Sequence, residues 1–321
     1  MTKPFIHLRC LSSYSLSEST LKIEKLVNLA KKNNMPALAI TDNNNMFGVF
    51  EFSQECVNNS IQPIIGTSIN LIDVQFKNTI SQLSFLVKNE IGYKNLIYLS
   101  SLSYLNKNRD LGISIADIEG HTEGLFCFLG GEFNPLLILH NQEKQTDDLI
   151  NNLKKLFKNN LLFELQRIND TEIDSYEEEL IIKSNKFNIP LIGTNNIKFG
   201  EEDEFAAHDA LLCVAQKTTI NSGSRKTSNN NLAFKNDQKM IGLFSDIPEI
   251  LENNFNVAIS CSYYPKEVLP KLPKFKNNLN LSESQLLVKI AKNGLIQKFE
   301  ENKIKDKKKY ENRLNYEIEI I

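Results

Sequence analysis

Residues 35–48 read Met-Pro-Ala-Leu-Ala-Ile-Thr-Asp-Asn-Asn-Asn-Met-Phe-Gly, and the apolar run at residues 37–40 has the length and composition of a buried strand. Just before this stretch, Asn33 and Asn34 are residues at which a helix typically stops. Further upstream, four apolar residues follow the spacing of one helix face: Ile23, Leu26, Val27 and Ala30. The sequence around this stretch therefore predicts a helix that leads into a strand.

Short apolar runs of this kind alternate with helical patterns along most of the chain. They cover residues 5–8, 37–40, 63–65, 83–87, 125–129, 161–165 and 190–193. Strands that alternate with helices are typical of parallel sheets, so we expect an α/β fold, either a barrel or a doubly wound sheet. After about Gly200 the rhythm changes, because residues 205–214 and 247–261 have helical patterns with no strand between them. Residues 218–231, rich in Ser, Asn and Lys, are expected to form an exposed loop.

The composition argues against several classes of function. Four histidines and no tryptophan in 321 residues leave few imidazoles for a His-rich metal centre. A formal net charge of -2 and a small number of arginines do not favour an independent DNA-binding module. The five cysteines form no C-x-x-C pair, so we expect buried free thiols in a reducing cytoplasm. No apolar run approaches the length of a membrane span, which favours a cytoplasmic protein with no membrane partner.

A domain boundary is expected near residue 270. Residues 267–279 are rich in Pro and Lys, and residues 282–299 and 307–321 have the patterns of charged amphipathic helices. We therefore assign residues 1–270 to one domain and residues 271–321 to a linker and further helices. The last residues of the chain are apolar and periodic, unlike a polar frayed terminus, so the chain is expected to continue in a longer protein.

Five stretches, taken in order, resemble the PHP (polymerase and histidinol phosphatase) domain at the start of bacterial DNA polymerase III alpha subunits. They are Phe5-Ile-His-Leu-Arg-Cys-Leu-Ser-Ser-Tyr-Ser, the stretch at residues 35–48, Ile61-Gln-Pro-Ile-Ile-Gly, Ala207-His-Asp-Ala-Leu-Leu-Cys and Lys309-Tyr-Glu-Asn-Arg-Leu-Asn-Tyr-Glu-Ile-Glu-Ile-Ile. The resemblance implies a distorted TIM-like PHP barrel of alternating strands and helices, followed by helices that lead toward the polymerase palm. Catalytic members of the family hold two or three metal ions at the carboxyl ends of the strands.

The positions that match the family's metal ligands are largely changed in this chain. The family's His-x-His pair matches Arg9 and Leu11, and the carboxylate that follows it matches Glu18. The family's Thr-Asp-His-Gly-Asn motif keeps its carboxylate at Asp42 and loses its imidazole at Asn43. In the later motifs, the ligands are replaced by Ser68, Ile168, Asn196 and Lys198.

Such extensive loss of ligands implies that this portion of the protein has no catalytic residues and holds no metal, because a metal-dependent phosphoesterase needs nearly all of its ligands. We also expect Lys198 or Arg9 to pair with Asp42 or Glu18, since a fixed cation would neutralise the carboxylates that remain. Two alternative interpretations stay open. One is an active metal-dependent PHP phosphoesterase, and the other is an interaction module unrelated to replication.

The resemblance implies that the longer protein is a DNA-directed DNA polymerase, a nucleotidyltransferase of DNA replication whose palm aspartates hold Mg²⁺. This chain contains no Asp-x-Asp sequence, so we expect those aspartates beyond Ile321. The role implied for this portion is to stabilise the polymerase and to dock the separate proofreading 3′-5′ exonuclease subunit of the polymerase III holoenzyme. DNA would be bound through the rest of the chain, and this portion would need no cofactor of its own.

Overall fold

The computed structural model describes residues 3–73, 76, 79–105, 111–140, 142–273, 275, 277–302, 304 and 306–321, apart from the side chains of residues 172 and 174. The chain divides into two compact units, Met1–Lys266 and Glu267–Ile321. The division therefore falls at the start of the Pro- and Lys-rich stretch.

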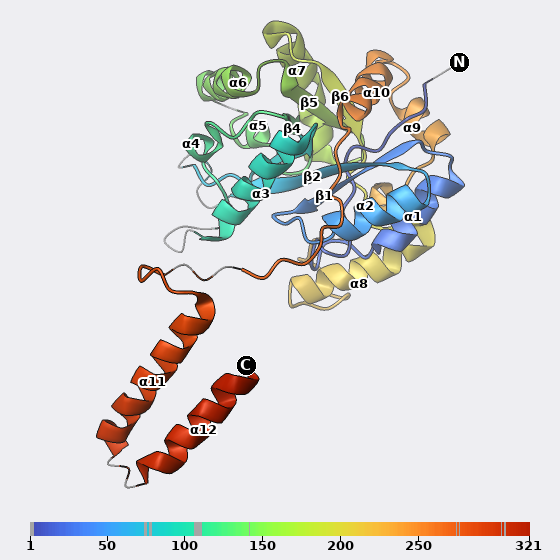
Figure 1. The fold of residues 1–321 in the computed structure, drawn as a ribbon. Coiled ribbons are helices and arrows are strands. Elements are labelled where there is room, and N and C mark those ends of the chain that lie inside the picture. The colour runs from blue at the N-terminus through green and yellow to red at the C-terminus, as the bar shows by residue number, and fades with distance from the viewer. Residues whose placement is uncertain are drawn as a thin grey trace. The chain divides into compact units, whose positions relative to one another are not determined.

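Within the described residues, the first unit contains one six-stranded sheet in which the strands are ordered β1 to β6 (Figure 1). The strands are β1 Ala37–Asn43, β2 Gln62–Asn70, β3 Gln82–Val87, β4 Leu125–Gly130, β5 Leu161–Gln166 and β6 Leu191–Thr194. Each overlaps one of the apolar runs, so these strand predictions are confirmed. The β1–β2, β4–β5 and β5–β6 pairs are parallel.

The expectation of parallel strands joined by helices is wrong at β3, which runs antiparallel to both β2 and β4. The connection between β2 and β3 covers residues 71–81. A parallel crossover needs about a dozen residues or more, usually with a helix, so this short connection returns the chain in the opposite direction.

The run at residues 5–8, which was expected to form a strand, lies outside the named strands, but the segment that it begins links the two edges of the sheet. On one side of this segment, the Thr41 amide of β1 donates to the Cys10 carbonyl at 2.8 Å. On the other side, the Leu11 amide donates to the carbonyl of Ile197, just after β6, at 2.9 Å. The segment therefore lies between β1 and the residues that follow β6, and the curled sheet closes into a distorted barrel. The α/β, TIM-like architecture expected from the sequence is confirmed.

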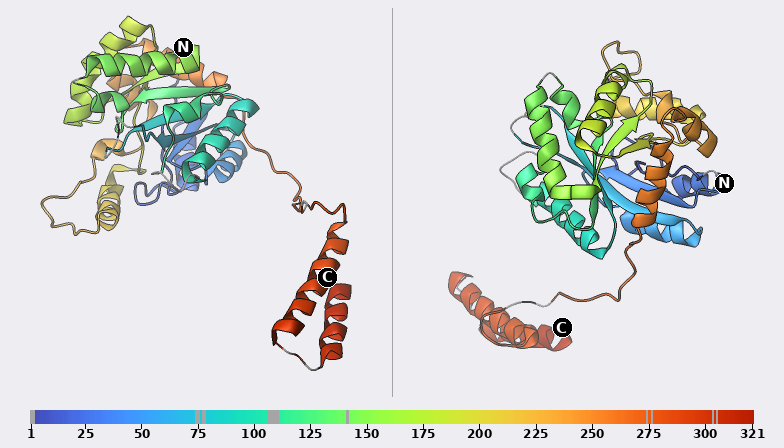
Figure 2. Two further views of the ribbon diagram at one scale, coloured as in Figure 1. Left: turned by 90° about the vertical axis from the view of Figure 1, so that its left-hand side faces the viewer. Right: turned by 90° about the horizontal axis from the view of Figure 1, so that it is seen from above.

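Helices surround this barrel, and most of them lie on its outer side (Figure 2). Those of the first unit are α1 Ile23–Lys32, α2 Val49–Asn58, α3 Glu90–Leu105, α4 Ile115–Ile118, α5 Pro135–Ile138, α6 Glu143–Phe157, α7 Thr171–Phe187, α8 Phe205–Ala215, α9 Asp237–Leu243 and α10 Glu249–Ser260. The helical patterns at residues 205–214 and 247–261 correspond to α8 and α10, so both of those predictions are confirmed.

Side chains alternate between two cores along the strands, as the period of two requires. In β1, Leu38 and Ile40 belong to the large core under the outer helices. The intervening residues belong to a second core inside the barrel, which includes Ala37, Ala39, Ile64, Leu86, Phe128, Leu162 and Ile192 and is closed by Val257 and Ala258 of α10. Two residues further along β5 and β6, on the face that points into the barrel, Glu164 follows Leu162 and Thr194 follows Ile192. The barrel interior is therefore apolar at one end and polar at the carboxyl ends of the parallel strands.

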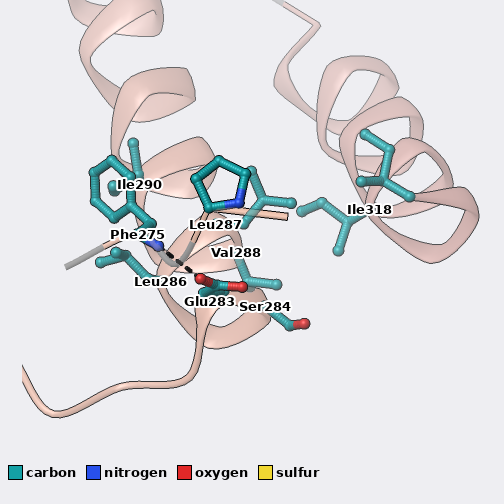
Figure 3. Close-up of a pocket in the computed structure, with 10 residues that line it drawn as sticks. Phe275, Glu283, Ser284, Leu286, Leu287, Val288, Ile290 and Ile318 are labelled. Atoms are coloured by element: carbon teal, nitrogen blue, oxygen red, sulfur yellow. Dashed lines mark hydrogen bonds between the residues drawn. The ribbon is translucent and has the colours of Figure 1, made fainter. Parts of the chain in front are cut away.

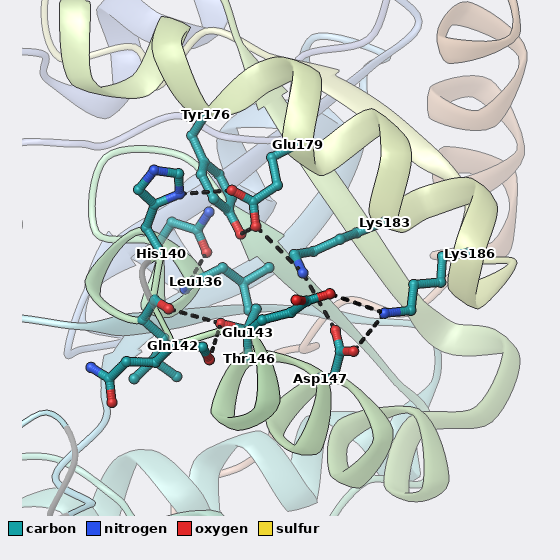
Figure 4. Close-up of polar contacts among 12 residues, drawn as sticks. Leu136, His140, Gln142, Glu143, Thr146, Asp147, Tyr176, Glu179, Lys183 and Lys186 are labelled. Carbon is teal, nitrogen blue, oxygen red and sulfur yellow. Dashed lines mark hydrogen bonds and ion pairs between the residues drawn. The ribbon is translucent and has the colours of Figure 1, made fainter.

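Polar contacts join α6 to α7 on the outer side of β4 and β5 (Figure 4). The buried ammonium group of Lys183 lies 3.4 Å from both Asp147 of α6 and Glu179 of α7. Lys186 contacts Asp147 at 2.6 Å, and His140 contacts Glu179 at 2.7 Å. The contacts of Asp147 hold α7 against α6, and His140 connects α7 to the segment before α6.

The second unit consists of α11 Glu283–Asn302 and α12 Lys307–Ile320, which pack against each other. Within the described residues, the buried side chains of α11 are Leu286 and Phe299, and α12 has none. Apolar residues of both helices, with Pro273 and Phe275 before them, line a groove of about 540 Å³ (Figure 3). Ile318 of α12 faces this groove opposite Leu287 and Ile290 of α11.

All five cysteines are described, and each is buried and free of disulfides, as expected. Among the described residues, the structure contains no helix that is both long enough and apolar enough to cross a membrane.

A polar pocket at the carboxyl ends of the parallel strands

Arg9 lies at the centre of the polar end of the barrel. Its Nη1 donates to Oε2 of Glu164 at 2.8 Å and to Oγ of Ser84 at 2.6 Å, and its Nε donates to Oδ1 of Asn196 at 3.3 Å. The exposed fraction of the side chain is 3% for Arg9 and 0% for Glu164. The ion pair is therefore shielded from water, and its strength depends on how completely its polar atoms are bonded.

Glu164 receives further donors from its own strand and from the next one. Its Oε1 accepts a hydrogen bond from Oγ1 of Thr194 at 2.5 Å and another from Nε2 of Gln166 at 2.9 Å. Ser68 of β2 lies on the far side, where its Oγ is 2.8 Å from Oγ of Ser84. Polar side chains of β2, β3, β5 and β6 thus form one buried network around a single guanidinium.

Glu132, just after β4, forms the second centre of charge. Nζ of Lys198 contacts Oε2 of Glu132 at 2.5 Å, and Nδ2 of Asn196 donates to the same oxygen at 3.0 Å, while Nζ of Lys226 contacts Oε1 at 2.5 Å. Burial alone would raise the pKa of Glu132, but the two ammonium groups outweigh it and lower that pKa to about 2. Glu132 is therefore ionised at neutral pH and neutralised by lysines from two separate segments.

Asp42 and Glu18 lie on the other side of the pocket and have different partners from those expected. Asp42 accepts hydrogen bonds from the amide and hydroxyl of Ser12, at 2.6 and 2.7 Å, and from the hydroxyl of Ser15 at 2.6 Å. Glu18 accepts from Nδ2 of Asn43 at 2.5 Å. Burial raises the pKa of Asp42 although these donors oppose the shift.

The expected pairing of Lys198 or Arg9 with Asp42 or Glu18 is therefore wrong. The carboxylate partner of Arg9 is Glu164 on β5. The carboxylate partner of Lys198 is Glu132, which lies two residues after the end of β4. The oxygens of Asp42 are already occupied by the turn that follows residue 11.

Residues 218–231 form the loop between α8 and α9, and most of them are exposed, so the expectation of an exposed loop is confirmed, but the loop is also attached to the pocket. Both guanidinium nitrogens Nη1 and Nη2 of Arg225 bond to the carboxylate of Asp209 at 2.7 Å, and the Ser228 amide donates to the same carboxylate at 2.9 Å. Buried His208 links Ser228, at 2.6 Å, to the backbone carbonyl of Glu18, at 2.8 Å. The bond from Arg225 is the main reason that the pKa of Asp209 is lowered to about 2.

The family comparison agrees with this architecture. The PHP domain model matches residues 7–168. This chain belongs to the PHP domain family. The match covers most of the segment that closes the barrel and strands β1 to β5, and it includes Arg9, Asp42, Glu132 and Glu164.

Curated relatives of this PHP domain are DNA polymerase III alpha subunits, as the resemblance predicted. The subunit of Rickettsia bellii is 35% identical over 337 residues, which cover 100% of this chain and 28% of that protein. The subunit of Rickettsia conorii is 37% identical, with 100% and 28% covered, and that of Caulobacter vibrioides is 30% identical, with 99% and 29% covered. The chain spans less than a third of the length of these relatives.

Two solved structures are similar at lower identity. One is an amidohydrolase from Chromobacterium violaceum with bound sulfate and no metal, with a TM-score of 0.41, 11% identity, and coverage of 62% of this chain and 89% of that one. The other is a two-domain protein from Bacteroides vulgatus containing a predicted PHP-like metal-dependent phosphoesterase. It has a TM-score of 0.42, 12% identity, and coverage of 62% and 53%.

The positions that match the PHP ligands do not all come together in the structure. Arg9, Ser68, Asn196 and Lys198 belong to the networks around Glu164 and Glu132. Asp42, Asn43 and Glu18 form a separate network. Leu11 is buried in the segment that closes the barrel, and Ile168 packs with Phe199, Leu232 and Ala233 in a small apolar cluster.

The residues present do not fit a PHP metal centre. Among the described residues, the structure contains no group of three or more His, Cys, Asp or Glu side chains that could hold a metal ion. Arg9 and Lys198 place fixed positive charges beside Glu164 and Glu132, where a divalent cation would have to compete with them. The carboxylates of the pocket are therefore engaged by cations or hydrogen-bond donors of the chain itself and are not a set of free ligands.

Sequence patterns missed Glu132, Glu164 and Lys226 as members of this pocket. Glu164 had a signal, because it is the one charged residue in the apolar run at residues 161–165. A charge at an inward-facing strand position needs a buried partner. Glu132 and Lys226 had no comparable signal, because they lie outside regular elements and meet through the fold.

Proposed function

We propose that this chain is a non-catalytic PHP domain portion of a DNA polymerase III alpha subunit, in which the former metal pocket serves as a structural core. The observation that carries the proposal is the buried pair of Arg9 and Glu164, together with Lys198 and Glu132. These pairs supply, from within the chain, the positive charge that catalytic members of the family obtain from metal ions.

A hydrolytic role is disfavoured on physical grounds. Metal-assisted phosphoester hydrolysis needs ligands that hold two ions, an activated water and an open approach for the phosphate. Here the carboxylates are each engaged by donors from serine, threonine, asparagine, glutamine, arginine or lysine side chains. Binding a metal would require breaking these contacts and bringing a divalent cation next to a guanidinium or ammonium group.

The activity of the whole protein would belong to residues outside this chain. We propose that the full-length protein is a DNA-directed DNA polymerase whose palm, beyond residue 321, holds Mg²⁺. Residues 1–270 would form the PHP domain, and residues 271–321 would form the linker and helices that enter the palm. The protein would act in the cytoplasm as part of the polymerase III holoenzyme, and it would contact DNA through the rest of the chain.

The metal proposal can be tested on the full-length alpha subunit that contains this chain. We expect no manganese or zinc bound stoichiometrically outside the palm, and no hydrolysis of bis-p-nitrophenyl phosphate in the presence of Mn²⁺. DNA elongation with Mg²⁺ provides the positive control for folded enzyme. Asp42→Asn is the matched variant: a hydrolytic activity that this substitution abolishes would overturn the proposal and establish a PHP phosphoesterase.

We further propose that this PHP domain docks the proofreading 3′-5′ exonuclease subunit. The support is the chain's place in the family and an interior that offers no chemistry of its own. A pull-down of the exonuclease with the full-length alpha subunit, compared with a subunit that lacks residues 1–266, tests this role. Capture should be lost on deletion. Equal capture by both forms, with elongation activity retained, would assign docking to another part of the protein.

A further inference from the structure

Helix α10 lies beside β6, the last strand of the sheet (Figure 1). Alternate residues of a strand direct their backbone groups to the same edge. The Pro190 carbonyl, just before β6, accepts from the Phe163 amide of β5 at 2.9 Å. The backbone groups of Leu191 and Gly193 therefore point to the other edge, where amide and carbonyl groups need partners that β5 does not supply.

Asparagine side chains of α10 bond to this edge in place of a neighbouring strand. Oδ1 of Asn254 accepts from the Gly193 amide at 3.1 Å, and its Nδ2 donates to the Gly193 carbonyl at 2.7 Å. The same Nδ2 donates to the Ile6 carbonyl at 3.3 Å, and Nδ2 of Asn253 donates to the Leu191 carbonyl at 2.8 Å. Asn254 is completely buried. One side-chain amide thus joins β6, the segment that closes the barrel and α10.

The second half of α10 closes the apolar end of the barrel interior. Val257 and Ala258 belong to the inner core, and so does Cys261, the residue that follows the helix. Nε2 of Gln62, at the start of β2, donates to the carbonyls of Ala258 and Cys261, both at 2.7 Å. The end of α10 is therefore tied to the sheet by hydrogen bonds as well as by apolar contacts.

Few buried side chains hold α10 in this position. They are Ile250, Asn254, Val257 and Ala258. Helix α10 is the last helix of the first unit, and residues 261–266 after it form no helix or strand. The bonds of Asn254 add little net free energy, because the same amide and carbonyl groups bond to water when the helix moves away. An element at the end of a unit with few buried apolar contacts is the kind that opens before the rest of the fold.

We propose that α10 is a detachable helix, which undocks from β6 as one unit while the rest of the barrel stays folded, and that Asn254 holds it in the docked position. Undocking opens the contact between β6 and the segment that closes the barrel. It also releases residues 261–266, through which the polypeptide leaves the first unit. The docked state of α10 therefore sets the point from which the chain beyond Lys266 extends. This inference concerns a movement within the domain, so it goes beyond the proposed function and does not depend on it.

Native cysteines report this movement in the full-length subunit that contains this chain. Cys261 follows α10 and Cys127 lies in β4, and both side chains have an exposed fraction of 0%. We expect Cys261 to react with a maleimide at least about tenfold faster than Cys127 in the native protein, because local opening exposes only Cys261. Both thiols should react equally fast in denaturant, with modification read by peptide mass spectrometry. Equal native rates would overturn the proposal.

Asn254→Ala tests whether α10 undocks as one unit. This variant should accelerate the labelling of Cys261 by a further factor of about ten and leave the rate at Cys127 unchanged. Asn256→Ala, which changes an exposed asparagine of the same helix, should alter neither rate. If Cys261 does not respond to Asn254→Ala, only the residues after α10 open, and the proposal is wrong. Equal acceleration at both thiols would also contradict it, because that result indicates a loss of global stability.

Hydrogen exchange of the unsubstituted subunit provides a second readout that does not depend on the folding of a variant. The amides of α10 and the Gly193 amide should share one protection factor, at least about tenfold lower than that of the β3 amides. The shared value is expected because the Gly193 amide loses its partner when Asn254 moves away. Exchange in α10 that is as slow as in β3 would refute undocking.

Discussion

The guanidinium of Arg9 lies 2.8 Å from the carboxylate of Glu164, and both side chains are almost completely buried inside the barrel. A buried pair of this kind adds little net stability over a well-packed apolar pair of the same size, but removing one partner leaves the other as an uncompensated charge. The pair is therefore expected to be sensitive to single substitutions and tolerant of paired ones.

Arg9→Met should lower the free energy of unfolding by about 3–5 kcal/mol, because it leaves the buried Glu164 carboxylate without a compensating positive charge. Urea denaturation in buffer with EDTA measures this loss. Adding Glu164→Gln removes the uncompensated charge and keeps the shape of the side chain. The double variant should therefore regain a large part of the lost free energy of unfolding. If the double variant is no more stable than Arg9→Met alone, charge compensation is not the role of Arg9.

The stability of the fold should depend on pH through Glu132. Because Lys198 and Lys226 lower the pKa of Glu132 from 4.5 to about 2 in the folded state, its contribution is fully present above pH 4.5. That contribution, on the order of 3 kcal/mol, should be lost progressively as the pH falls from 4.5 toward 2. Glu132→Gln should flatten the curve of unfolding free energy against pH in this window. Glu319→Gln, which changes an exposed carboxylate of α12, should leave the curve unchanged.

The loop between α8 and α9 should open when its anchor is removed. Arg225→Gln breaks the two bonds from Arg225 to Asp209, so cleavage of residues 216–232 by proteinase K should become several-fold faster while the barrel stays intact. Arg313→Gln, which removes an exposed arginine of α12, serves as the control. An unchanged cleavage rate in Arg225→Gln would mean that the loop is held by its other contacts.

Gly131 allows the backbone to pass close to the pocket. Its φ of +73° is in the left-handed region, and a Cβ at this position would lie 2.7 Å from Nε2 of Gln166 and 3.0 Å from Oε2 of Glu164. Gly131→Ala should therefore cost about 2 kcal/mol or more of unfolding free energy, through backbone strain and displacement of both side chains. Gly242→Ala in α9, where a Cβ meets nothing within 4 Å, should be neutral or slightly stabilising in the same denaturation experiment.

Local patterns predicted most of the strands because each buried strand of this barrel is apolar on both faces over several residues, as in the β1 run at residues 37–40. The sequence pattern did not predict helix α3. Its exposed face carries Ile97, Tyr98 and Tyr104 in addition to the buried leucines of its inner face, so it lacks the one-sided periodicity by which an amphipathic helix is found. The reversed direction of β3 was also missed, because strand direction depends on the connection and not on the composition of the strand.

The sequence by itself determined the family and the loss of imidazoles at the PHP ligand positions, because both depend only on which residue stands at each place in an ordered set of motifs. The tertiary structure alone decided which charges meet. Arg9 and Glu164 are 155 residues apart in the chain, and Lys198 and Glu132 are 66 apart. Their contacts depend on how a curled sheet closes, since a long cationic side chain can reach several carboxylates and bonds to the one that the barrel brings within hydrogen-bonding distance.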